Sequence, residues 1–211
     1  MENIYQLLDK IKPRPGMYLG KGSISALAQF IGGYDYAFHS LGIDNPEMPP
    51  FHMFHEWAAH RFNWYESTAG WSHIILQECE GNEARALDVF YQVLEDFKRL
   101  IPIAITKVSI QPENRAFYEA RQAETRQLFK LNSDEYTSVI PDTLFLIEFS
   151  DLFGYYIYEV KNDKVISIDR RYKTKEEVVK RVKADFGENL NMVEIVRDEV
   201  ERLFKKLVMG T

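Results

Sequence analysis

The chain has 211 residues, of which 45% are hydrophobic and 14% aromatic. That is enough apolar material for one large domain or two small ones, and it excludes wholesale disorder. The 26 Lys+Arg and 32 Asp+Glu residues give a net charge of −6, which argues against a dedicated nucleic-acid binder.

Cysteine use and hydropathy indicate the compartment. The single cysteine, Cys79, excludes an intramolecular disulfide and a Cys-rich zinc module, and it favours a reducing environment. No uncharged apolar run is long enough to span a membrane, and the first residues do not form a signal peptide. We therefore expect a soluble cytoplasmic protein.

Charge is divided unevenly along the chain, which predicts two units with different surfaces. Residues 1–106 hold 8 Lys+Arg and 13 Asp+Glu, whereas residues 107–211 hold 18 and 19. We expect an α+β protein with a helical unit over residues 1–105, a helical connector over 106–138, and a small α+β unit over 139–211. That last unit should combine a small antiparallel sheet with C-terminal helices.

The first unit shows helical spacing of its apolar residues. A first helix is predicted over residues 4–11 and ends at the prolines that follow. Ser23 is the predicted N-cap of a second helix, in which Gly32-Gly33 predicts either a break or close packing against another backbone. A helix over residues 51–65 and another running from Asn82 to Ile101 complete this unit.

The remainder begins with a polar helix over residues 113–130, typical of a surface element. Strands are predicted over residues 144–149, 155–160 and 165–170, and Asn162-Asp163 predicts a hairpin between the last two. Thr174 to Glu177 form a predicted capping box for a helix that ends at Gly187. The final predicted helix has an apolar stripe of Val193, Val196, Val200, Leu203 and Leu207.

The string Arg14-Pro15-Gly16-Met17-Tyr18-Leu19-Gly20 resembles a segment beside the nucleotide in the ATPase domain of DNA gyrase and its relatives. That family also uses a helix with an acid and an amide for water and Mg²⁺, and an Asp-Xaa-Gly adenine site. Here the following helix carries Asp35 without a Glu-Asn pair. Because phosphoryl transfer needs those groups, ATPase activity is not expected.

A second resemblance is longer. The same string, together with Phe30 to Tyr34, Trp57 and Gly70-Trp71, is similar to an uncharacterised family of small bacterial proteins. Some members are reminiscent of immunity proteins of polymorphic toxin systems. The resemblance implies a non-catalytic protein that binds a protein partner, such as a bacterial toxin, and it is our leading hypothesis.

Two other functions are open. His52 and His55, three residues apart on one predicted helix, would form a metal-dependent site if a third ligand such as His73 joined them; His60 points elsewhere on the helical wheel. Alternatively, the second unit could bind nucleic acid. Its basic segment contains Arg170, Arg171, Lys173, Lys175, Lys180, Arg181 and Lys183.

For the leading hypothesis, the acidic first unit is the expected binding surface. Toxins that attack nucleic acids present basic clefts, and complementary charge speeds the encounter. The expected partner-binding residues are Glu78, Glu80 and Glu83 for steering and Trp71 as an aromatic anchor. No catalytic residue and no cofactor are expected, and the oligomeric state is open.

Overall fold

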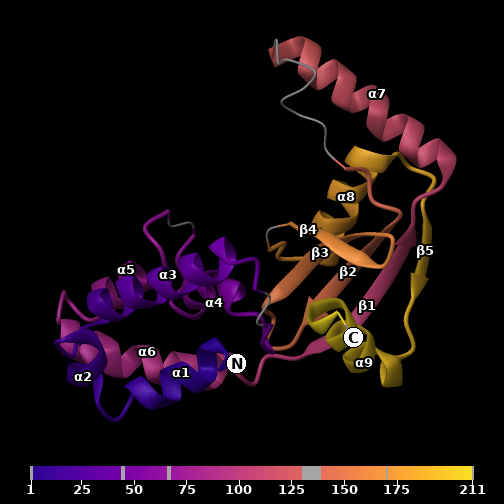
Figure 1. Ribbon diagram of the computed structural model, residues 1–211. Helices are drawn as coiled ribbons and strands as arrows, with labels where there is room; N and C mark the ends of the chain where they lie inside the picture. The colour runs from indigo at the N-terminus through magenta and orange to yellow at the C-terminus, as the bar shows by residue number, and fades with distance from the viewer. Residues whose placement is uncertain (1, 44–45, 66–67, 130–138, 170, 211) are drawn as a thin grey trace. The chain divides into compact units, whose positions relative to one another are not determined.

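The computed structural model describes residues 2–43, 46–65, 68–129, 139–169 and 171–210. The chain forms two compact units, residues 1–100 and 101–211 (Figure 1). It is α+β, as expected: helices come first, followed by a five-stranded antiparallel sheet interleaved with further helices. Within the described ranges, no helix is both long enough and apolar enough to cross a lipid bilayer.

The first unit is helical. Its elements are α1 (Ile4–Ile11), α2 (Pro15–Leu19), α3 (Ile24–Ser40), the short 3-10 helix η1 (Phe51–Met53), α4 (Phe54–Arg61), α5 (Trp71–Glu78) and α6 (Glu83–Phe97). Side-chain caps begin three of them: Asn3, Ser23 and Asn82 each accept a hydrogen bond from the backbone three residues on. These caps confirm the helix starts predicted at Ser23 and Asn82.

Aromatic rings form the core of this unit. Phe54 is fully buried, and its ring centre lies 5.3 Å from those of Phe51, Phe90 and Phe97 and 5.6 Å from that of Trp71. These rings come from η1, α4, α5 and α6, so this one cluster joins the consecutive elements η1 and α4 to two later helices. Edge-to-face pairs of this kind add to the stabilisation from burial.

The second unit is organised by its sheet. The elements are β1 (Pro102–Ser109), α7 (Pro112–Phe129), β2 (Thr143–Phe149), β3 (Gly154–Lys161), β4 (Lys164–Ile168), α8 (Lys175–Phe186), β5 (Asn191–Glu194) and α9 (Arg197–Met209). The strand order is β4-β3-β2-β1-β5, and all neighbours are antiparallel. Asn162 and Asp163 have φ values of 49° and 61°, which confirms the predicted hairpin as a turn with two left-handed residues.

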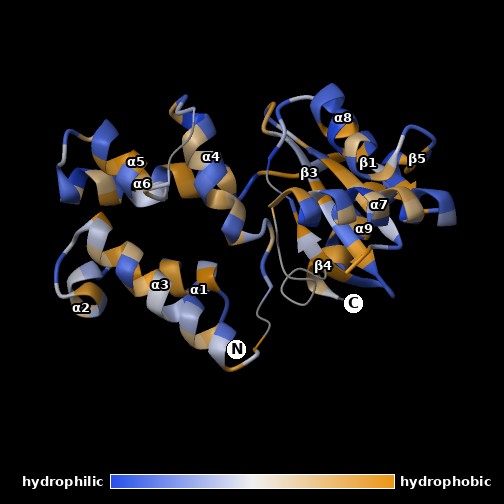
Figure 2. Cartoon of the chain, turned by 90° about the horizontal axis from the view of Figure 1, so that it is seen from above, coloured by the Kyte–Doolittle hydropathy of each residue, from blue (hydrophilic) through white to orange (hydrophobic). Residues whose placement is uncertain are grey.

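Helices cover both faces of the sheet, as Figure 2 shows with α8 and α9 on opposite sides. Side chains along each strand point alternately to the two faces of the sheet, so neighbouring residues pack into different cores. Leu146 and Ile157 pack with Val182 and Phe186 of α8. On the other face, Phe204 of α9 lies 5.3 Å from Phe149 and 5.8 Å from Tyr158, measured between ring centres.

The polar helix α7 is anchored to the second unit by its N-terminal half. The buried Asn114 amide donates to the backbone oxygens of Phe186 and Asn189, at 3.0 and 2.9 Å. Tyr118 stacks on Phe186, and Arg121 pairs with Asp185 at 3.0 Å. Part of the segment expected to be a connector is therefore attached to α8, and the last of its residues, 130–138, lie outside the described ranges.

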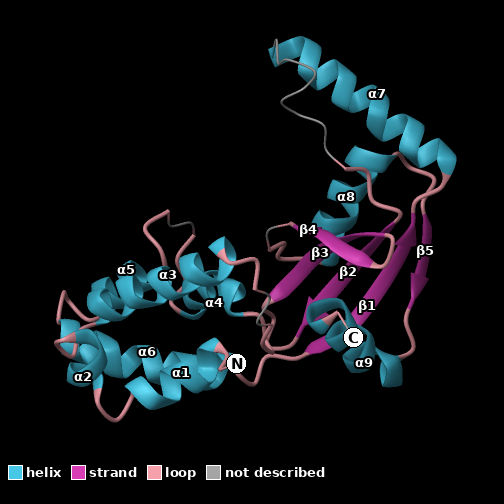
Figure 3. Ribbon diagram, in the orientation of Figure 1, coloured by secondary structure: helices cyan, strands magenta, loops and turns pink. Residues whose placement is uncertain are grey.

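The structure corrects the sequence interpretation at two strands, β1 and β5 (Figure 3). Residues 102–109 form β1 and not the end of a helical unit, and residues 191–194 form β5 where the sequence predicts a helix. Val193 and Val196 therefore lie outside α9, and both are exposed. Their helical spacing is misleading because β5 gains backbone hydrogen bonds by pairing with β1, which is distant in sequence.

In the first unit, three local expectations are also corrected. The helix predicted over residues 51–65 consists of η1 and α4 and ends at Arg61. The helices α2 and α5 are additional to those that the sequence predicts. The glycine pair in α3 causes neither a break nor close packing, since a Cβ on Gly32 or Gly33 would meet nothing within 4 Å.

Two glycine substitutions should change stability in opposite directions. A Cβ at Gly154, where φ is +109°, would lie 2.2 Å from the backbone oxygen of Tyr172. Gly154→Ala should therefore lower the free energy of unfolding by about 1–3 kcal/mol, because the backbone at the start of β3 must move. Gly33 lies in a helix and has open space around it. Gly33→Ala should therefore raise the free energy of unfolding by about 0.5–1 kcal/mol. Urea unfolding followed by circular dichroism measures both, and equal effects of the two variants would contradict this assignment.

Candidate functional site

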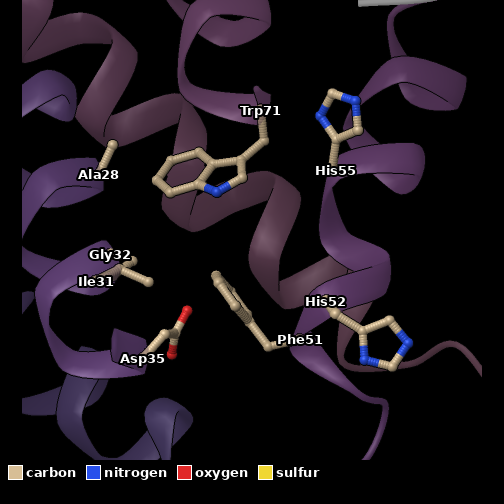
Figure 4. A pocket seen from close by; sticks show the side chains of 8 residues that line it. All are labelled: Ala28, Ile31, Gly32, Asp35, Phe51, His52, His55 and Trp71. Carbon is tan, nitrogen blue, oxygen red and sulfur yellow. The ribbon is translucent and has the colours of Figure 1, made fainter. Parts of the chain in front are cut away.

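A cleft of about 240 Å³ opens in the first unit between α3, η1–α4 and α5. It is lined by Ala28, Ile31, Gly32, Asp35, Phe51, His52, His55 and Trp71. Ile31 and Phe51 are buried and form its apolar floor, whereas Asp35 and His52 lie at the exposed rim. Figure 4 shows the Asp35 carboxylate and the indole ring of Trp71 on either side of the space next to Phe51.

The walls of the cleft are rigid because they belong to the aromatic core. Phe51 stacks on Phe54 with an interplanar angle of 9°. Trp71 packs against Phe90 with 4.8 Å between ring centres, so its inner face is covered while the residue remains half-buried. Such packing fixes the side chains in place before any ligand arrives, which lowers the entropic cost of binding.

One carboxylate, Asp35, lines the cleft, and a second, Glu47, lies close enough to feel its charge. Partial burial raises the pKa of Asp35 even though the residue is at the rim. Burial also raises the pKa of Glu47, and the charge of Asp35 raises it further, against the lowering effect of the hydrogen bond that Glu47 accepts from the Phe51 backbone at 2.8 Å. Both shifts indicate negative charge that nearby cations do not offset.

The histidines of the metal hypothesis both line this cleft. In Figure 4 the His52 ring lies on the far side of Phe51 from Asp35. Desolvation lowers the pKa of His52, so the ring is neutral at pH 7. The Nδ1 atom of His55 is buried and has no hydrogen-bond partner among the described residues. The described part of the chain contains no group of three His, Cys, Asp or Glu residues placed to hold a metal ion.

The expected partner-binding residues have different surroundings. Trp71 lines the cleft, and Glu78 and Glu80 are exposed near the end of α5. Glu78 accepts a hydrogen bond of 2.8 Å from the indole nitrogen of Trp64, which holds its carboxylate in one orientation. Glu83 instead makes internal contacts: it accepts from the Ser25 backbone at 3.0 Å and from its hydroxyl at 2.7 Å, at the N-terminus of α3.

Three residues of the basic segment in the second unit, Lys175, Arg181 and Lys183, make ion pairs. Arg181 pairs with Asp185 at 3.1 Å and approaches Asp169 at 3.6 Å. Lys175 pairs with Glu194 at 2.7 Å, and Lys183 with Glu188 at 2.8 Å. Arg171 donates to the Phe153 backbone oxygen, and Arg170 lies outside the described residues. These contacts reduce the positive charge that this surface offers to phosphates.

Two features singled out in the sequence lie apart from the cleft lining. The segment Arg14 to Gly20 folds as the short helix α2, which ends at Gly20 with φ of 73°. Cys79 is buried at the end of α5, and burial raises the pKa of its thiol. A raised pKa reduces the thiolate fraction that nucleophilic chemistry requires.

Sequence reasoning missed Asp35 and Gly32 as site residues. A signal was present, because Ala28, Ile31, Gly32 and Asp35 occupy positions i, i+3, i+4 and i+7 of one helix face. A face of small and apolar residues that ends in a carboxylate predicts a hollow with one charged group. Glu47 had no such signal, since its proximity to Asp35 depends on the fold of the loop before η1.

Comparison with known proteins gives no relative: no family model, no curated protein and no solved structure matches this chain.

The internal bonds of Glu83 predict a pH-dependent contribution to stability. The hydrogen bonds from Ser25 lower the pKa of Glu83, so the stabilisation is complete above the unfolded-state pKa of about 4.3 and is lost as the pH falls through the folded pKa. At pH 7, Glu83→Gln should reduce the free energy of unfolding by about 0.5–1 kcal/mol, the usual value of a carboxylate at a helix N-terminus. This difference should shrink as the pH falls below about 4.3, because the carboxylate of the natural chain then becomes protonated.

Urea unfolding followed by tryptophan fluorescence measures this effect selectively, because all three tryptophans lie in the first unit. Asp88→Asn is the matched control, since it removes one exposed charge from the same helix. A stability difference for Glu83→Gln that persisted unchanged to pH 3.5 would contradict the role of the ionised carboxylate.

Proposed function

We propose that this protein is a non-catalytic protein-binding protein whose first unit docks on a basic partner, as an immunity protein neutralises a bacterial toxin. The observation that carries the proposal is the cleft of the first unit, where an aromatic wall stands next to carboxylates without an ion-pair partner among the described residues. The resemblance of the N-terminal segments to immunity-like bacterial proteins supports the same function.

The distribution of charge favours the first unit over the second as the docking surface. Residues 1–100 contain 8 Lys+Arg and 13 Asp+Glu, a net charge of −5, while residues 101–211 have −1. A charge of one sign on one unit attracts a partner of opposite charge over distances of roughly a Debye length, about 8 Å at physiological salt.

Steering and anchoring would fall to different residues. Glu78 and Glu80 are exposed and raise the rate of encounter without being buried in the complex. The half-buried aromatic cleft supplies the desolvated centre on which binding energy concentrates. Glu83 is assigned to neither task, because Ser25 already uses its carboxylate.

The steering role can be tested by removing charge. The double variant Glu78→Gln/Glu80→Gln should lower the association rate with a basic protein that a neighbouring gene encodes and that the natural chain binds, by roughly threefold or more at low salt. It should also flatten the dependence of that rate on ionic strength, while the dissociation rate changes little. Stopped-flow association over a salt series measures both quantities.

The double variant Glu119→Gln/Glu124→Gln is the matched control, because it removes two exposed charges from α7 in the second unit. It should leave the association rate nearly unchanged. Equal effects of the two double variants would overturn the assignment of steering to the first unit. Failure to bind any neighbouring-gene product would overturn the immunity-like function.

A further inference from the structure

The negative charge beside the cleft has no counterpart in the described part of the protein. Asp35 makes no hydrogen bond and no ion pair with a described residue, and its pKa responds to burial without any compensating cation. Glu47 lies near enough for its own pKa to be raised by Asp35. Elsewhere in the first unit carboxylates do find partners, as Asp96 does with Arg61 and Arg99. The cleft is therefore a place where a cation would relieve repulsion between two acids.

Aromatic rings line the same cleft as this negative charge. Phe51 forms the floor, and Figure 4 shows Trp71 on the opposite side from Asp35. The faces of aromatic rings attract cations, and tryptophan does so most strongly. Guanidinium groups are weakly hydrated and planar, so they stack on such rings and donate to a carboxylate at the same time. An ammonium group is more strongly hydrated and loses more on leaving water.

The volume of the cleft suits a single side chain, and the other titratable groups near it carry no positive charge. The volume of about 240 Å³ is below the ~300–1,000 Å³ of pockets for drug-sized ligands. Gly32 keeps the space open, since it has no Cβ and nothing occupies the position where one would lie. Of the other groups that face the cleft, His52 has a lowered pKa and is neutral at pH 7. Tyr5, which contacts the loop before η1, has a raised pKa and is also neutral.

We propose that this cleft is a binding site for the guanidinium group of an arginine side chain, held between the Asp35 carboxylate and the rings of Phe51 and Trp71. In the setting of the proposed function, on which the identity of the source depends, the arginine belongs to the basic surface of the protein partner. The cleft then selects one residue of that partner, in addition to the general attraction of opposite charges.

The test uses the full chain and a small probe, so it does not require the partner. N-acetyl-arginine amide is titrated while the indole N–H resonance of Trp71 is followed by NMR, with Trp71→Phe used to assign it among the three tryptophans. The neutral isostere N-acetyl-citrulline amide is the control ligand. We expect a saturable shift of the Trp71 signal with the arginine probe and no saturable shift with the citrulline probe.

Two variants locate the site. Asp35→Asn should lower the affinity for the arginine probe about tenfold, because a charge-assisted hydrogen bond is lost. Asp88→Asn, an exposed acid on α6 outside the cleft lining, should leave the affinity unchanged. Gly32→Leu should block the cleft by filling it, and its circular dichroism spectrum shows whether the helix remains folded.

Each outcome decides the proposal. Saturable binding that Asp35→Asn weakens and Asp88→Asn does not would support it. Equal responses to the arginine and citrulline probes, no saturable shift, or binding that survives both Asp35→Asn and Gly32→Leu would overturn it. These outcomes would overturn the arginine site and not the proposed function, because the steering experiment tests different residues, Glu78 and Glu80. A partner that binds normally to Asp35→Asn would leave the proposed function standing and remove the arginine site.

Discussion

The packing of aromatic rings around Phe54 is the interaction on which the first unit depends. It joins η1, α4, α5 and α6, and two of its members, Phe51 and Trp71, are also walls of the cleft. Site and core are therefore one structure, and the walls do not have to be ordered when a ligand binds. A substitution in this cluster would disturb the shape of the cleft and the stability of the unit together, which makes the two effects hard to separate by mutating the rings themselves.

Charge is handled differently in the two units. In the second unit, ion pairs join α7, α8 and the strands, and nearby acids pair with Lys175, Arg181 and Lys183 of the basic segment. In the first unit, acidic residues exceed basic ones, and Asp35 lines the cleft with a second carboxylate, Glu47, close enough to feel its charge. The contrast depends on fold as well as on composition, because Arg181 meets Asp169 only after the end of β4 and α8 have been brought together, whereas Asp185 lies one turn further along α8.

Much of the fold was predictable from local signals, and the two missed strands have a common cause. Ser23 and Thr174 cap helices as predicted, since a cap needs only a side chain and a backbone amide three residues apart. The strands β1 and β5 were missed because their pairing partners are distant in sequence, and Val193 of β5 continues the helical spacing of Val196 and Val200. The Glu177 side chain also departs from the expected capping box, because it accepts from Lys173 and not from Thr174. The candidate site lay between these extremes. The sequence singled out Trp71, His52 and His55, which all line the cleft. Asp35 had a signal in the spacing of its helix face, whereas Glu47 comes near Asp35 only through the fold.

The two edge strands of the sheet also restrict how this protein can meet other chains. An exposed edge is a template on which a foreign strand can form backbone hydrogen bonds. Here β4 has 5 residues and β5 has 4, and Glu194 at the end of β5 is held by Lys175. Edges this short offer few hydrogen bonds to an incoming strand. The sheet is therefore protected against polymerisation through its edges, because an incoming strand would gain little by pairing with either of them.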